Sequence, residues 1–203
     1  MSFKIVNEFE KTIADFFGAP FGVAVDSCTH GVELCLRHTK AKFITTPNRT
    51  YPSIPMLANK LNIGHSFVNY KWSEYYYVTG RVLDAAVLWR PNSYIKDTFM
   101  VLSFQYRKHL GLGRGGMILL DNWEDYIDLK SLSYDGRDIS TWDTDKPWRE
   151  QNIKNIGYHY YMTPESAQKG LHMFNDALAT EPKLWTDKDY PDLTKMEVFN
   201  ASN

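Results

Sequence analysis

Apolar positions along the chain recur with two different periods. Residues 3–17 carry Phe, Ile and Val at spacings of three and four, and Gly18 and Pro20 close the segment, which predicts an amphipathic helix. Short apolar runs follow, and each is bounded by turns or helical segments: FGVAV (21–25), FITTP (43–47), HSFVNY (65–70), residues 75–79, RVLDAAVLW (81–89), FMVLSF (99–104) and GMILLDN (116–122). Such runs are typical of strands that are buried on both faces.

Helical patterns separate these strands. They are predicted for GVELCLRH (31–38) after the turn SCTH (27–30), for the later part of 48–62 after an initial loop, for part of 123–139, and for 163–179 with Thr163 as N-cap. No element is predicted for the polar tract STWDTDKPWREQN (140–152) or for the last 20 or so residues. The alternation predicts an α/β domain, a three-layer α/β/α arrangement around a mixed, mostly parallel sheet.

Charge and cysteine content narrow the possible partners. The chain of 203 residues has 23 basic and 24 acidic side chains, a net charge of -1, so no bulk attraction to nucleic acid or to an anionic membrane is expected. No run approaches the ~20 apolar residues of a membrane-spanning helix, and the N-terminus lacks a signal-peptide core. Cys28 and Cys35 form neither a disulfide framework nor a metal spacing, and the histidines are scattered, so we expect a cytoplasmic protein without a metal.

The stretch SFQYRKHLGLGRGG (103–116) matches the spacing GxGxxG at Gly111, Gly113 and Gly116. A dinucleotide site needs a helix after these glycines, whereas the run that follows reads as a strand. A phosphate-binding loop of the Walker type needs its lysine after the last glycine, but Lys108 precedes all three. One alternative is a plain hairpin that carries a solvated lysine and no chemistry.

Other segments supply what pyridoxal phosphate (PLP) requires. This cofactor needs a lysine for a covalent bond, a carboxylate at its ring nitrogen, donors around its phosphate and an aromatic face. Lys108 fits the first requirement and Asp84, at the end of an apolar strand, the second. The turn SCT (27–29), before a helix, fits the third. The competing interpretation of Asp84 is a helix cap with two alanines in the first turn.

Five blocks, in order, make the pattern more specific: DSCTHGVELCL (26–36), TPNRTYPSIPMLA (46–58), LDAAVLW (83–89), LSFQYRKHLGLGRGGMIL (102–119) and GYHYYMTPESAQKGL (157–171). In these blocks the chain resembles the DegT/StrS sugar aminotransferases, which are PLP-dependent enzymes of fold type I. The resemblance implies ping-pong transfer of an amino group from an amino acid, commonly glutamate, to a nucleotide-linked keto sugar, as in polysaccharide biosynthesis. It also implies a homodimer with shared active sites.

The resemblance assigns a role to each matching position. Lys108 would be the catalytic lysine that bonds to the cofactor, and Asp84 would be the partner of the ring nitrogen. The remaining cofactor contacts would come from Cys28, Thr29 and Ser103 at the phosphate, Tyr51 stacked on the ring, and His159 reaching a phosphate in the neighbouring subunit's site.

Several positions depart from the family pattern. Val87 stands where a polar side chain usually contacts the cofactor oxygen, His159 replaces an asparagine, and Arg114 stands where an acidic residue is common. The chain also looks like an unusually short member, with a PLP-binding large domain at 1–135 and a reduced C-terminal segment at 136–203 that contacts the partner subunit. The alternative function is therefore a degenerate homologue that binds PLP or a sugar without efficient turnover.

Overall fold

The computed structural model describes residues 3–138, 148–150 and 152–200, so most of the polar tract 140–152 lies outside the described residues. The helices are α1 (Lys4–Phe17), α2 (Cys28–His38), α3 (Ser53–Leu61), α4 (Trp123–Ser133), α5 (Pro164–Leu178) and α6 (Glu197–Asn200), with short 3-10 turns η2 (Trp148–Glu150), η3 (Asp187–Asp189) and η4 (Leu193–Lys195). The strands are β1 (Phe21–Val25), β2 (Phe43–Pro47), β3 (Gly64–Val68), β4 (Tyr76–Thr79), β5 (Val82–Asp84), β6 (Phe99–Ser103) and β7 (Gly116–Leu120).

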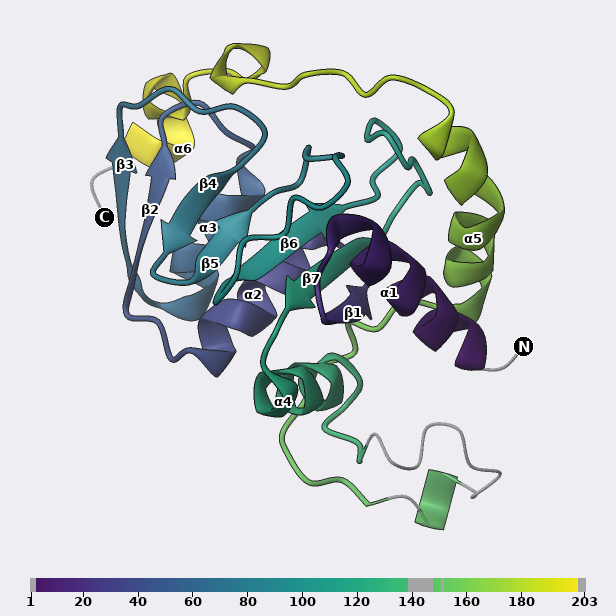
Figure 1. The fold of residues 1–203 in the computed structure, drawn as a ribbon. Helices are drawn as coiled ribbons and strands as arrows, with labels where there is room; N and C mark the ends of the chain where they lie inside the picture. The colour runs from purple at the N-terminus through teal and green to yellow at the C-terminus, as the bar shows by residue number, and fades with distance from the viewer. Residues whose placement is uncertain (1–2, 139–147, 151, 201–203) are drawn as a thin grey trace.

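Five strands form the central sheet in the order β1-β7-β6-β5-β4, and β2 and β3 form a parallel pair beside β4 (Figure 1). The predicted α/β class is confirmed, but the expectation of a mostly parallel sheet is wrong. Within the five-stranded sheet, β5 and β6 are parallel, while β1 with β7, β7 with β6, and β5 with β4 are antiparallel.

The connections explain this error. Residues 80–81 join β4 to β5 as a tight turn, with Gly80 at φ +40°, and residues 104–115 bring the chain straight back from β6 into β7. Residues 80–81 are too few for a crossover, and residues 104–115 form a loop without a helix, so each connection reverses the strand direction. An apolar run indicates that a strand is buried on both faces. The direction of that strand in the sheet depends instead on the path of the connecting segment.

Helices cover both faces of the sheet, as the three-layer prediction requires. Side chains of β1, β6 and β7 alternate, so that Met100, Leu102 and Met117 pack toward α1 and α5, while Val101 and Ile118 pack toward α2. Figure 1 shows α1 and α5 side by side on the first face. Gly170 permits this close approach, because a Cβ there would lie 2.5 Å from the ring of Phe9.

A buried ion pair joins α1 to α4 beside the edge strand β1. Glu10 of α1 accepts a hydrogen bond from the backbone N–H of Ala24 at 2.8 Å and pairs with the ammonium group of Lys130. Lys130 also donates to the side chain of Asn7 at 2.6 Å. Both charged side chains are buried, so each depends on the other and on these hydrogen bonds.

The C-terminal segment returns across the molecule from α5 toward β2 and β3 (Figure 1). Backbone hydrogen bonds hold it in place: Glu74 donates to Trp185 at 3.1 Å, Asp187 to Trp72 at 3.1 Å and Leu193 to Asn48 at 2.8 Å. None of the helices in the described part of the chain is long and apolar enough to cross a membrane.

Candidate active site

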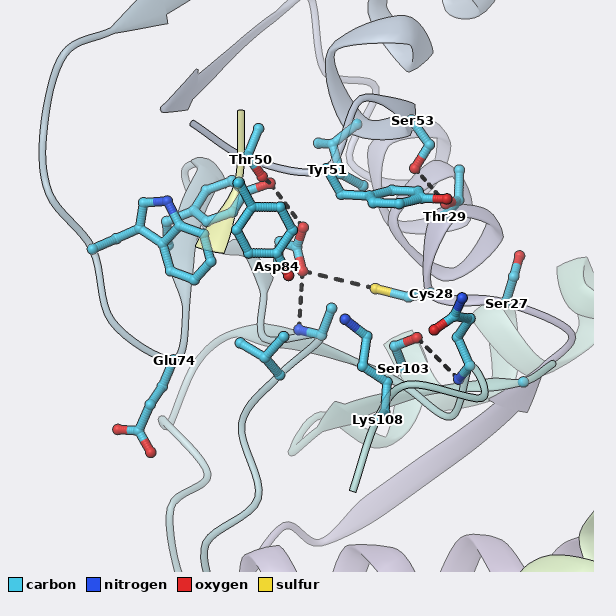
Figure 2. A pocket seen from close by; sticks show the side chains of 18 of the residues that line it. Ser27, Cys28, Thr29, Thr50, Tyr51, Ser53, Glu74, Asp84, Ser103 and Lys108 are labelled. Carbon is cyan, nitrogen blue, oxygen red and sulfur yellow. Dashed lines mark hydrogen bonds between the residues drawn. The ribbon is translucent and has the colours of Figure 1, made fainter. Parts of the chain in front are cut away.

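A cavity opens where β5 and β6 end and where α2 begins. Its volume is about 180 Å³. Six of the seven predicted site residues line it: Cys28, Thr29, Tyr51, Asp84, Ser103 and Lys108 (Figure 2). Residues separated by up to 80 positions therefore meet in one place, as the sequence predicts.

Asp84 is the buried anion of this cavity. Its side chain is 5% exposed, and it accepts hydrogen bonds from the hydroxyl of Tyr76 at 2.8 Å and from the backbone N–H of Ala86 at 3.0 Å. Burial raises the pKa of the Asp84 carboxyl, while the bond from Tyr76 opposes this shift. A turn follows Asp84 instead of a helix, so the interpretation as a helix cap is wrong.

Lys108 lies in the loop between β6 and β7, and Figure 2 shows its side chain extending into the cavity toward Asp84. The loop is held in shape by backbone hydrogen bonds, among them Lys108 N–H to Gln105 at 2.8 Å and Leu112 N–H to Phe104 at 2.9 Å. Burial lowers the pKa of the Lys108 ammonium group, and the nearby Asp84 opposes this effect. A larger fraction of this amine is therefore neutral near pH 7 than for a solvated lysine, as a nucleophile or base requires.

Polar groups gather at the start of α2. Ser27 is the N-cap and accepts a hydrogen bond from the His30 N–H at 3.2 Å. The helix therefore begins at Cys28, within the stretch 27–30 that the sequence pattern predicts as a turn before a helix at 31–38. Gly116 lets the helix start rest on β7, because a Cβ there would lie 2.6 Å from the Cys28 nitrogen. Ser103 pairs with Gly116 in the sheet and therefore lies close to this helix end. A helix N-terminus beside hydroxyl groups favours an anion such as phosphate.

The cavity wall also carries the aromatic ring of Tyr51 and the thiol of Cys28. Tyr51 precedes α3 and is 55% exposed, which leaves its ring accessible for stacking. Thr29 and Ser53 share a hydrogen bond at 2.7 Å and so connect α2 to α3. Burial raises the pKa of the Cys28 thiol well above its usual range, so this cysteine stays protonated and is a poor nucleophile.

The glycines that follow Lys108 have structural reasons. Gly113 and Gly115 adopt φ of +101° and +149°, which side chains disfavour, and a Cβ at Gly111 would lie 2.9 Å from the carbonyl oxygen of Tyr106. They lead into β7 rather than into a helix, so the GxGxxG spacing does not mark a dinucleotide site.

Known aminotransferases resemble this chain in sequence and in fold. The first 87 residues match the DegT/DnrJ/EryC1/StrS aminotransferase family. This match confirms the resemblance drawn from the sequence blocks. No curated protein sequence is similar enough to the chain to count as a match.

Solved structures show the same fold. AtS13 from Actinomadura melliaura has a TM-score of 0.73 at 19% identity, over 88% of this chain and 61% of its own. The PLP form of Spr1654 from Streptococcus pneumoniae has a TM-score of 0.69 at 17% identity, and the match covers 86% of this chain and 60% of Spr1654. DesI, solved in the presence of its TDP-sugar product, has a TM-score of 0.65 at 18% identity, and the match covers 85% of this chain and 54% of DesI. The chain thus spans less than two thirds of the length of these structures.

Three departures from the DegT/DnrJ/EryC1/StrS pattern can now be located. Val87 lines the cavity and offers no polar atom there beyond its backbone. His159 is the one predicted site residue outside the cavity; its side chain is 69% exposed and its Nδ1 lies 3.1 Å from the Asp135 carboxylate. Arg114 forms an ion pair with Asp26 at 2.7 Å at the cavity rim, which explains how this family-atypical cation is accommodated.

Sequence reasoning missed three aromatic residues that line this cavity, Trp72, Tyr76 and Tyr190, and it missed Trp185, which lines an adjoining cavity. Tyr76 orients Asp84 and receives a hydrogen bond from Thr50 at 2.7 Å. The alternating burial of β4, with Tyr76 and Val78 inside, is a signal that could have revealed it. No comparable signal exists for Tyr190 or Trp185, because they lie in an irregular segment whose position depends on long-range contacts.

Proposed function

We propose that the chain is a PLP-dependent aminotransferase that moves an amino group from an amino acid to a keto sugar. The observation that carries this proposal is the convergence of the Lys108 amine, the buried Asp84 carboxylate and the N-terminus of α2 on one cavity. The match of residues 1–87 to the aminotransferase family and the likeness in fold to the PLP form of Spr1654 support it.

The residues present fit this cofactor. A buried carboxylate is costly unless donors or a cation compensate for the lost water, and burial still raises the pKa of Asp84 despite the hydrogen bonds from Tyr76 and Ala86. A protonated pyridine nitrogen is a cationic donor that meets this need. The phosphate would lie at the α2 N-terminus with Cys28, Thr29 and Ser103, and Tyr51 would stack on the ring.

Bound PLP supplies an electron sink for negative charge that develops at the substrate α-carbon. Lys108 would hold the cofactor covalently, and its neutral amine would accept the proton from the donor's α-carbon. The lowered pKa of Lys108 favours this role. Asp84 would hold the ring nitrogen in its protonated form, and Tyr76 and the Ala86 N–H fix the orientation of its carboxylate.

The finer features of the proposal come from the family resemblance. They are a ping-pong mechanism, glutamate as donor, a nucleotide-linked keto sugar as acceptor and a part in polysaccharide biosynthesis. A homodimer would place His159 in the partner's site, which accords with its exposure and its position outside the cavity of its own chain. The division at residues 135 and 136 and a cytoplasmic location, the latter supported by two free cysteines, belong to the same proposal.

The alternative is a homologue that binds PLP or a sugar without efficient turnover. Val87 favours it, because this side chain cannot make the polar contact that the family pattern places near the cofactor.

Absorbance spectra of the protein with PLP separate these functions. An aminotransferase is expected to show a visible band from lysine-bound cofactor, and glutamate is expected to bleach it as the amine form appears. A band that no amino donor bleaches would support the degenerate homologue. No band at all, with folded protein, would contradict both.

Replacing Tyr76 tests the support of Asp84. Tyr76→Phe removes the donor to a buried carboxylate, so the dissociation constant for PLP is expected to rise by about threefold to tenfold. Fluorescence titration with PLP measures this change. Tyr77→Phe is a matched control, because the side chain of Tyr77 is exposed. Equal affinities of the two variants for PLP would be evidence against a role for Tyr76.

A further inference from the structure

A second cavity adjoins the first at Lys108. Its volume is about 270 Å³, and it shares Ala86, Val87, Ser103 and Lys108 with the first cavity. The two cavities differ in charge. Asp84 and Glu74 line the first, whereas none of the described residues lining the second is Asp or Glu. An anionic group is therefore disfavoured in the first cavity near Asp84 and favoured in the second.

The C-terminal segment supplies two walls of the second cavity. Trp185 is fixed by the backbone hydrogen bond that its carbonyl accepts from Glu74 at 3.1 Å. The ammonium groups of Lys108 and Lys183 both lie over its ring, at 5.0 Å and 3.9 Å from the centroid. Trp185 thus lies beside both lysines and links the second cavity to Lys108.

Not every basic group around this cavity is free to bind a ligand. His109 places its Nε2 2.7 Å from the carbonyl oxygen of Ala177, and Lys183 pairs with Asp189 at 2.5 Å. Arg107 has an exposed side chain whose guanidinium lies 5.3 Å from the Tyr106 ring, and no ion pair is seen for it within residues 3–138, 148–150 and 152–200. The guanidinium group of Arg107 is thus available to bind both oxygens of a carboxylate, and Lys183 is a second cation beside it.

We propose that Arg107, Lys183 and Trp185 form a donor subsite that binds the carboxylates of a dicarboxylic amino acid while its amine faces Lys108. The inference rests on the proposed function and assigns residues to its donor half-reaction. The shared lining of the two cavities supports it, since a short amino acid can reach from Lys108 into the second cavity. Two cations on different segments match a donor with two carboxylates better than one with a single carboxylate.

Calorimetric titration with glutarate, an unreactive five-carbon dicarboxylate, tests the subsite on PLP-loaded protein. Arg107→Gln is expected to raise the dissociation constant of glutarate by roughly tenfold to a hundredfold, because a charge-assisted bidentate contact is lost. Lys183→Gln is expected to raise it by about threefold, because this exposed lysine already pairs with Asp189. Arg107→Lys keeps the charge and should retain part of the affinity.

Matched controls lie far along the chain from the subsite. Arg149→Gln and Lys11→Gln each remove an exposed cation that pairs with a nearby carboxylate, and both should bind glutarate like the unmodified protein. Titration with thymidine diphosphate distinguishes a carboxylate site from a site for the acceptor's diphosphate. If Arg107→Gln weakens this nucleotide and leaves glutarate unchanged, the proposed ligand class is wrong.

The outcomes separate this inference from the proposed function. If glutamate bleaches the visible band while Arg107→Gln and the unmodified protein bind glutarate equally, the subsite is refuted and the transaminase proposal stands. If the band or its bleaching is absent but Arg107→Gln still loses glutarate, the carboxylate site stands and the transaminase proposal fails. If the unmodified protein does not bind glutarate at millimolar concentration, the subsite is also refuted.

Discussion

Lys108→Ala is expected to abolish the visible absorption of the PLP-loaded protein and to slow the glutamate half-reaction by at least about 10³-fold. The expectation follows from its position: the amine extends into the cavity toward Asp84, and its pKa is lowered by burial. No other lysine lines this cavity among the described residues, so no neighbouring amine can replace it there. Stopped-flow absorbance after mixing with glutamate measures the rate.

Lys96→Ala, which removes an exposed lysine from a loop outside both cavities, serves as the control and should keep the band and the rate. The far-UV circular dichroism of Lys108→Ala should match that of the unmodified chain, because the side chain is only partly buried in a polar cavity. Full transamination by Lys108→Ala would rule out the proposed mechanism.

Lys130→Met is expected to lower the free energy of unfolding by about 3–5 kcal/mol, the largest stability loss that we expect for a single substitution. The change leaves the Glu10 carboxylate buried between α1, α4 and β1 without its cation. Chemical denaturation followed by circular dichroism measures the loss. Lys11→Met, on the exposed side of α1, should change stability by less than about 0.5 kcal/mol.

The double variant Glu10→Gln/Lys130→Met separates charge from packing. A glutamine at position 10 can still accept the Ala24 N–H through its amide oxygen, so the double variant should recover most of the stability that Lys130→Met loses. A loss of less than 1 kcal/mol in Lys130→Met would show that water or rearrangement compensates for the missing ammonium group.

Local patterns and the family resemblance together pointed to six residues that the structure brings to one cavity. Asp84, Ser103 and the start of α2 each stand where a strand ends or a helix begins, and such boundaries can be read from apolar runs and capping residues. The order of the blocks along the chain then related Lys108 to these positions. The structure brings all of them to one cavity, although their roles remain part of the proposed function.

Properties that depend on distant contacts could not be predicted. The direction of β7 follows from how residues 104–115 fold back, and its apolar run looks the same in either direction. Trp185 and Tyr190 are held in place by hydrogen bonds that join their segment to the backbone of Trp72 and Glu74 and to the guanidinium group of Arg49. These contacts join residues more than 100 positions apart, so no local periodicity can encode them.

The buried Glu10–Lys130 ion pair between α1 and α4 also affects how the molecule can associate with a second copy. An exposed edge strand offers unpaired N–H and C=O groups that invite a strand from another chain. At β1 the N–H of Ala24 is already taken by Glu10, and α1 and α4 pack against the strand. A second copy that added a strand here would have to displace a buried carboxylate, so pairing of subunits at this edge is disfavoured.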